Sequence, residues 1–148
     1  MMEEDEYKQA YHTLNPTPCV FEKALLSGRC RCAYSQRLNI AEREAMLCQA
    51  PSLSLSCAAL LTTLRQKASF ALKLTQVQAP LPHAKEMKVQ CGGLLGLQAV
   101  LCSEDEQVDN IAALIHQALG VFGDLEHLPY QSLVHAIHHY QVRSSGRA

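Results

Sequence analysis

A chain of 148 residues is long enough to bury a hydrophobic core as one domain, without disulfides or metal ions to staple it. Hydrophobic residues make up 48% of the chain and charged residues 18%, which indicates a globular protein rather than a disordered one. The formal net charge of -1 argues against a dedicated nucleic-acid-binding protein, since such binding depends on many basic contacts with phosphates. We predict a single domain over residues 1–148, with a flexible segment over 1–16 and a disordered tail over 143–148.

The N-terminal sequence also bears on location. It is acidic (MMEEDEYKQAYHTLNP) and has neither the basic start nor the apolar stretch of a secretory signal. No run approaches the roughly 18 apolar residues of a membrane helix. We therefore expect a cytoplasmic protein that does not bind membranes. Because the cytosol is reducing, the seven cysteines are interpreted as metal ligands, reactive thiols or small buried residues, and not as disulfides.

The first third of the chain contains two predicted helices. Thr17 and Pro18 suit the start of a helix over 19–27, and Gly28 suits its end. The following residues, RCRCAYSQR, have no helical periodicity and predict a loop.

A capping-box pattern, Asn39 with Glu42, predicts a second helix over 40–49, which Pro51 would end. A long apolar pattern over 55–74, capped by Ser52 or Ser54, predicts the next helix.

The second half of the chain has the same character. The best internal linker is TQVQAPLPHA, because two prolines interrupt it. Helices are predicted over 85–102, from Ser103 to Phe122 with Gly123 at its end, and from Pro129 onward. No useful β-alternation and no Asn-Gly or Asp-Gly turn occurs. These patterns predict an all-α fold, a compact bundle of about five or six helices.

Four cysteines are the leading candidates for a metal site: Cys19 in the first helix, Cys30 and Cys32 in the loop, and Cys48 near the end of the second helix. An iron–sulfur cluster needs four thiolates that converge on it. A helix of about nine residues is about 14 Å long, and a helical hairpin holds its loop at the end opposite to its outer ends. The four thiolates therefore meet only if the helices are short or fold back.

Two further cysteines could serve as ligands, and three nearby arginines could compensate the charge of the site. Cys57 could join Cys48 across the turn at Pro51, and Cys91 precedes two glycines that allow a cluster or another helix to approach closely. These two are reserve ligands, whereas Cys102 is expected to be part of the core. Three arginines would offset the negative charge of thiolates: Arg29, Arg31 and Arg37.

Other chemistries are less well supported. No Gly-x-Cys-x-Gly elbow marks a cysteine nucleophile, and no Cys-x-x-Cys marks a thiol–disulfide enzyme. His135, His138 and His139 share a helix face on which two imidazoles could hold zinc, but there is no His-Glu-x-x-His motif. We interpret this histidine face as a solvated polar surface.

The Cys-x-Cys pair, the IAERE segment and the HAKEMKVQCGG segment together resemble a pattern in small cysteine-rich proteins of proteobacteria. The resemblance covers residues 19 to about 101. It implies a bacterial cytosolic protein and brings no activity with it.

The sequence therefore predicts a protein that binds an iron–sulfur cluster, with 4Fe-4S favoured, through Cys19, Cys30, Cys32 and Cys48. Its role would be electron transfer or redox sensing, with a protein redox partner or a second copy of itself, and not substrate turnover. Two alternatives stay open: a structural zinc site made by the same thiolates, and a metal-free helical interaction module. Four thiolates suit both zinc and iron–sulfur clusters, so the sequence does not choose between them.

Overall fold

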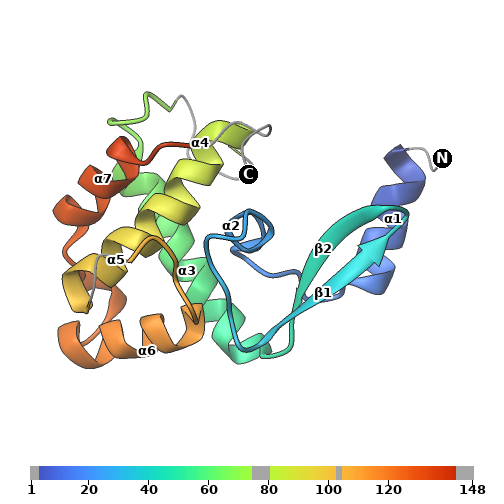
Figure 1. Ribbon diagram of the computed structural model, residues 1–148, viewed down its shortest axis with the longest axis horizontal. Helices are drawn as coiled ribbons and strands as arrows, with labels where there is room; N and C mark the ends of the chain where they lie inside the picture. The colour runs from blue at the N-terminus through green and yellow to red at the C-terminus, as the bar shows by residue number, and fades with distance from the viewer. Residues whose placement is uncertain (1–3, 75–80, 103–104, 143–148) are drawn as a thin grey trace.

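The computed structural model describes residues 4–74, 81–102 and 105–142. If α4, η1 and α5 are counted as one continuous helix, these residues form six α-helical elements and one two-stranded antiparallel sheet (Figure 1). The prediction of a mostly helical fold with five or six helices is confirmed. The prediction that the fold is all-α is wrong, because a β-hairpin replaces one expected helix.

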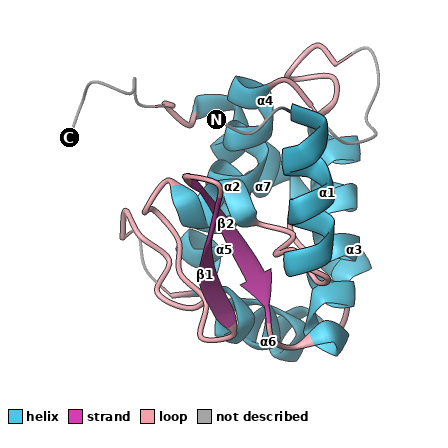
Figure 2. Cartoon of the chain, turned by 90° about the vertical axis from the view of Figure 1, so that its right-hand side faces the viewer, coloured by secondary structure: helices cyan, strands magenta, loops and turns pink. Residues whose placement is uncertain are grey.

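The elements follow in chain order: α1 (Glu4–Leu14), α2 (Glu22–Leu26), β1 (Ser35–Ile40), β2 (Arg43–Cys48), α3 (Pro51–Ala68), α4 (His83–Met87), the π-helical turn η1 (Lys88–Gly92), α5 (Gly93–Leu101), α6 (Ile111–Phe122), the 3₁₀ turn η2 (Leu125–His127) and α7 (Tyr130–His139). In Figure 1 the hairpin and α1 project from a body made of the other helices, and Figure 2 views the molecule from the side of that projection.

The β-hairpin occupies the segment that the capping-box pattern assigned to a helix over 40–49. Strand β1 pairs with β2 from Ser35 opposite Cys48 to Ile40 opposite Arg43. The two residues between the strands, Ala41 and Glu42, have φ of 50° and 72°. Positive φ at both central residues is the signature of the two-residue turn that matches the twist of a hairpin. The expected helix is wrong because this turn reverses the chain where a helix would continue.

A third extended segment lies along β2. The Cys48 amide donates to the Thr17 carbonyl at 2.7 Å, and the Cys19 amide donates to the Met46 carbonyl at 2.9 Å. These bonds hold residues 17–19 beside the strand, so α2 begins at Glu22 and not at residue 19. The predicted end of this helix is confirmed, since Gly28 has φ of 83°.

Helix α1 packs on the hairpin. Arg43 forms an ion pair with Glu4 at 3.0 Å, and its guanidinium lies 4.1 Å from the centre of the Tyr7 ring. The Tyr11 hydroxyl donates to the carboxylate of Glu22, which also accepts the Met46 amide at 2.7 Å. Most of the segment that we expected to be flexible, 1–16, is therefore helical. The expected disordered tail, 143–148, lies outside the described residues.

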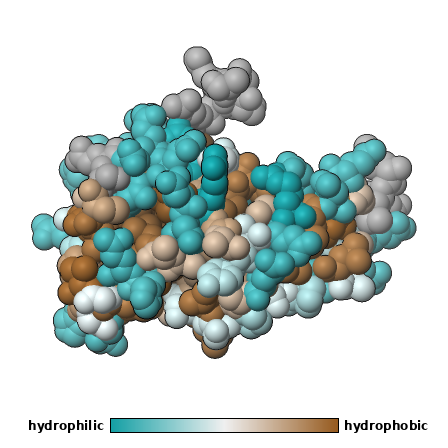
Figure 3. Space-filling model, turned by 60° about the horizontal axis from the view of Figure 1, so that its bottom comes forward, coloured by the Kyte–Doolittle hydropathy of each residue, from teal (hydrophilic) through white to brown (hydrophobic). Residues whose placement is uncertain are grey.

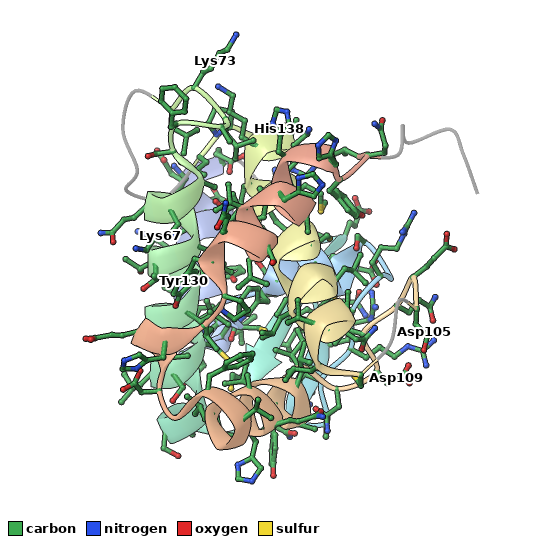
Figure 4. All side chains as sticks on the ribbon, turned by 90° about the vertical axis from the view of Figure 1, so that its left-hand side faces the viewer. Lys67, Lys73, Asp105, Asp109, Tyr130 and His138 are labelled. Atoms are coloured by element: carbon green, nitrogen blue, oxygen red, sulfur yellow. The ribbon has the colours of Figure 1, made fainter. Side chains whose placement is uncertain are left out.

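The continuous helix α4–η1–α5 runs through the centre of the helical body. A Cβ built on Gly92 would lie 2.8 Å from Ile137 Cα, and one built on Gly96 would lie 2.7 Å from Ala136 Cβ. The glycines therefore let α7 approach this helix closely, and they serve helix packing. The Lys67 ammonium of α3 lies 5.4 Å from the centre of the Tyr130 ring of α7. Both residues are labelled in Figure 4.

A buried polar network ties α2 and α3 to the same continuous helix. Glu86 is 2% exposed and receives two hydrogen bonds from the Arg65 guanidinium, at 3.0 and 2.7 Å. Gln90 donates to the Glu86 carboxylate at 2.6 Å and accepts the Ala24 amide at 3.0 Å. The side-chain carbonyl of Gln90 thus accepts the backbone amide of Ala24. Amides in the first turn of a helix have no acceptor within their own helix.

Several predicted helix boundaries move by a few residues. Pro51, expected to end a helix, is the first residue of α3. Leu60, Leu61 and Leu64, which belong to the apolar pattern that predicted this helix, are buried. Helix α6 begins at Ile111, and the expected cap Ser103 lies outside the described residues, as does most of the linker (75–80). None of the helices in the described ranges is long and apolar enough to cross a membrane.

Candidate metal centre

Four cysteines from four different segments line one pocket between the hairpin, α3 and α6: Cys19, Cys32, Cys48 and Cys57. We call it the four-cysteine pocket. Its cavity is small, with about 20 Å³ open to a water molecule. All four thiols are free and partly buried. Most of the remaining wall is apolar: Val20, Phe21, Leu53, Ile111 and Ala112.

The hairpin brings three of these cysteines together. Cys48 lies opposite Ser35 at the open end of the hairpin, and the Ser35 hydroxyl donates to the Cys32 carbonyl at 2.8 Å. This turn places Cys32 next to the end of β2. Cys19 lies along the other edge of β2, where its amide binds Met46. Two long helices would have held the loop cysteines away from Cys19 and Cys48. The cysteines can meet because α2 has only five residues and a β-hairpin takes the place of the expected second helix.

The fourth cysteine of the pocket comes from α3. Pro51 opens this helix directly after the strand, so Cys57, in its second turn, faces back toward the strand end. Cys57 is the ligand that we held in reserve on the basis of the turn at Pro51. At the same corner, the Ala50 amide donates to Cys48 Sγ at 3.4 Å. Amide hydrogen bonds of this kind stabilise thiolates and tune the potentials of the clusters that thiolates bind.

The environment keeps two of these thiols protonated. Burial, together with the negative charges of the neighbouring cysteines, raises the pKa of Cys19 to about 12. Burial and the charges of Cys32 and Cys48 raise the pKa of Cys57 to about 11. These charges act between the thiols because all four cysteines line the same pocket. Because metals bind thiolates, binding in this pocket must release protons.

The four thiols are not gathered tightly around one point. Within the described residues, no group of three or more His, Cys, Asp or Glu side chains is arranged to hold a single metal ion. A single zinc ion requires four ligands at about 2.3 Å when they are sulfur. A 4Fe-4S cluster binds one thiolate at each of its irons, so its ligands stand further apart.

Cys30 lies outside the pocket, although it is only two residues from Cys32. The Arg31 amide donates to the Val108 carbonyl at 2.8 Å, and the Val108 amide donates to the Arg29 carbonyl at 2.9 Å. This pairing docks the loop on the segment before α6 and leaves Cys30 only 1% exposed. Of the four expected ligands, the structure brings Cys19, Cys32 and Cys48 together and places Cys30 elsewhere.

Cys30 lies against Cys91, the other reserve ligand, which is fully buried in η1. A hydrogen bond between the two thiols, with further bonds from Ser27 and Tyr140, lowers the pKa of Cys91 to about 7. The same contact raises the pKa of Cys30. Cys102, expected in the core, is exposed because it follows the last turn of α5.

The arginines near the Cys-x-Cys pair do not line the four-cysteine pocket. Arg29 lies 5.9 Å from the centre of the Tyr140 ring, on the side of Cys91. Arg37 forms an ion pair with Glu44 across the hairpin. The charge of Arg29 therefore acts on Cys30 and Cys91 and not on the four-cysteine pocket, and Arg37 pairs with Glu44 instead.

The histidine face on α7 contains stacked imidazoles. The ring centres of His135 and His139 are 4.4 Å apart, and those of His138 and His139 are 4.9 Å apart. Figure 4 shows His138 near the end of α7, beside the start of the continuous helix, where Lys88 donates to its carbonyl at 3.0 Å. These histidines belong to no metal-holding group in the described ranges.

Comparisons with known proteins add no further identification. No protein-family model matches this chain, and no curated protein or solved structure matches it. The resemblance to cysteine-rich proteins of proteobacteria therefore stays a prediction. The function has to be inferred from the chemistry of the four-cysteine pocket.

Proposed function

We propose that this protein binds an iron–sulfur cluster of the 4Fe-4S type through Cys19, Cys32, Cys48 and Cys57. One observation carries the proposal: four of the seven cysteines come from four separate segments and line a single pocket. Thiolates are the soft ligands that iron–sulfur clusters and zinc prefer, and four of them complete the ligand set of a cluster. The set differs from the sequence prediction in one position, since Cys57 takes the place of Cys30.

The proposed role is electron transfer or redox sensing. Four protein thiolates leave no iron with an open position for a substrate, just as a metal site closed by four protein ligands is structural and not catalytic. Each one-electron reduction adds a negative charge to the site. Apolar neighbours such as Leu53 and Ile111 disfavour that charge, whereas the Ala50 amide on Cys48 stabilises it. The balance of these effects sets the potential.

A redox partner would approach the pocket at its mouth. Tyr34 lines the pocket and is 44% exposed, so it connects the wall of the pocket with the protein surface. Elsewhere the exposed apolar side chains are widely separated along the chain, as at Leu55, Phe70 and Val121. On the face shown in Figure 3, hydrophobic residues lie among hydrophilic ones. This mixed surface favours a site-centred function over a broad apolar docking face.

The test is the metal content of protein that is purified without oxygen. We expect a brown protein with about four irons and about four sulfides per chain, and broad absorbance near roughly 400 nm. A colourless protein with one zinc per chain would replace the cluster by a structural zinc site. A folded, colourless protein without metal would leave the interaction module as the better explanation.

A further inference from the structure

A second group of sulfur atoms lies apart from the four-cysteine pocket. The Cys91 thiol lies 3.6 Å from Met87 Sδ, and the buried thiol of Cys30 interacts with that of Cys91. We propose that Cys30, Cys91 and Met87 form a binding site for a soft monovalent metal ion, with Cu(I) as the natural candidate. This site is independent of the proposed cluster, because none of the three residues lines the four-cysteine pocket.

The fold brings the three sulfurs together from two directions. Met87 and Cys91 are four residues apart on the continuous helix, and both side chains can therefore lie on one face. Cys91 lies within the π-helical turn η1, a local widening that is frequently found at functional sites. Cys30 arrives from the loop that pairs with Val108 and is buried against this turn.

The spacing of the sulfurs suits one shared ion. A metal–sulfur bond of about 2.3 Å places two sulfurs of a trigonal site roughly 4 Å apart. The observed 3.6 Å between Cys91 Sγ and Met87 Sδ is close to that separation. An ion held by Cys91 and Met87 would replace the thiol proton of Cys91, and Cys30 would complete the site.

The ligand types select among metals. Thiolate and thioether sulfur are soft ligands that favour Cu(I), whereas zinc sites are built from thiolates, imidazoles and carboxylates and usually need four of them. Within the described residues, Cys30 and Cys91 are in no group with a third His, Cys, Asp or Glu that could hold a metal ion. The third ligand that the structure offers is the thioether of Met87. A site with two thiolates and one thioether is therefore expected to prefer Cu(I) to zinc.

The side chains around Cys30 and Cys91 can stabilise thiolates, and they lie close enough to the surface for a metal ion to enter. The Ser27 hydroxyl is 3.8 Å from Cys91 Sγ, and the Tyr140 hydroxyl also interacts with this thiol. Arg29 lies over the Tyr140 ring and places a positive charge near both cysteines. Such second-layer contacts orient metal ligands and offset their charge. Ser27 is exposed, and Arg29 and Tyr140 are partly exposed, so the sulfurs lie one layer of side chains below the surface.

The test is a titration of reduced, oxygen-free protein with Cu(I) in competition with a coloured Cu(I) chelator. The full-length protein carries Cys19→Ser, Cys32→Ser, Cys48→Ser and Cys57→Ser, which remove all four thiolates of the pocket. We expect one tightly bound Cu(I) per chain, with a first shell of sulfur only in X-ray absorption. Met87→Leu, a volume-conserving change, should weaken binding at least roughly tenfold. Met46→Leu is the matched control, because Met46 is a buried methionine of β2, and it should leave the affinity unchanged.

Two results would overturn this assignment. The first is equal Cu(I) affinity in the Met87→Leu and Met46→Leu proteins. The second is tight binding that survives Cys91→Ser. Since Met87→Leu keeps the shape of the side chain, the test holds even if the serine variant does not fold. Met87→Leu in the otherwise natural chain should also keep its iron and sulfide, so failure of the copper site and failure of the cluster are distinguishable.

Discussion

Replacement of Glu86 by leucine should destabilise the whole protein strongly. Glu86 is buried, and its carboxylate receives two hydrogen bonds from Arg65 and one from Gln90. The Arg65 side chain is only 13% exposed. Glu86→Leu therefore leaves a largely buried guanidinium without its partner, and it also removes the acceptor of the Gln90 amide. Neither group can regain full contact with water.

The magnitude follows from the geometry. Loss of one partner of a buried ion pair typically costs 3–5 kcal/mol, and the slight exposure of Arg65 places the expected loss at about 3 kcal/mol of unfolding free energy. For a chain of this length, each kcal/mol corresponds to roughly 2–4 °C of melting temperature, so the midpoint should fall by about 6–12 °C. Arg65→Met combined with Glu86→Leu should cost far less, because no unpaired charge remains.

Urea unfolding of the parent, the two single variants and the double variant measures this directly. We expect the midpoint concentration to fall while the dependence on urea stays constant, and the double variant to recover most of the loss of Glu86→Leu. Hydrogen exchange should show early opening of α2 in Glu86→Leu, because Gln90 holds the Ala24 amide. A loss below about 1 kcal/mol, or a double variant as unstable as the worse single one, would refute the reasoning.

Two further predictions concern helix packing and pH. Gly92→Ala should destabilise the fold by about 1–3 kcal/mol, because the new methyl group meets the Ile137 backbone. Gly93→Ala should cost less, because its methyl group meets only flexible side chains. Urea unfolding compares the two variants, and equal losses of unfolding free energy would contradict the close packing of α7. Burial raises the pKa values of Cys19 and Cys57 to about 12 and about 11, so these thiols stabilise the metal-free fold below about pH 9 and lose that contribution as the pH rises through the folded values. Unfolding at about pH 8 and about pH 11 should show a smaller loss of stability in Cys19→Ala than in the parent, and parallel losses would contradict the burial of this thiol.

Most of the helical structure could be predicted from local signals. The apolar spacing of Leu60, Leu61 and Leu64 and the left-handed Gly28 and Gly123 reflect interactions within a few residues of each position. The hairpin could not be predicted in this way. Its turn is Ala-Glu and contains no glycine or asparagine, and its strands do not alternate strictly between buried and exposed residues. Long-range packing therefore overrides the local signal for a helix.

The candidate site was predictable in part for the same reason. Cysteine spacing alone indicated that thiols from the first 57 residues could meet, and the turn at Pro51 indicated Cys57 as a reserve ligand. Which cysteines share a pocket depends on the hairpin and on the pairing of the loop with Val108, which is nearly eighty residues away in sequence. Cys30 and Cys32 are therefore assigned to different sites by contacts that no local pattern contains. The contact between Cys91 and Met87, by contrast, follows from helical spacing.

The most direct test of the proposed cluster site is a comparison of Cys57→Ala with Cys30→Ala. Alanine is used in both because Cys30 is buried and a serine hydroxyl there would need a partner. The iron and sulfide content of both proteins, purified without oxygen, is measured beside that of Cys102→Ala, which changes an exposed thiol. We predict that Cys57→Ala loses most of its iron and sulfide, while Cys30→Ala and Cys102→Ala keep the content of the parent. A cluster that survives in Cys57→Ala and is lost in Cys30→Ala would contradict the assignment of the four-cysteine pocket.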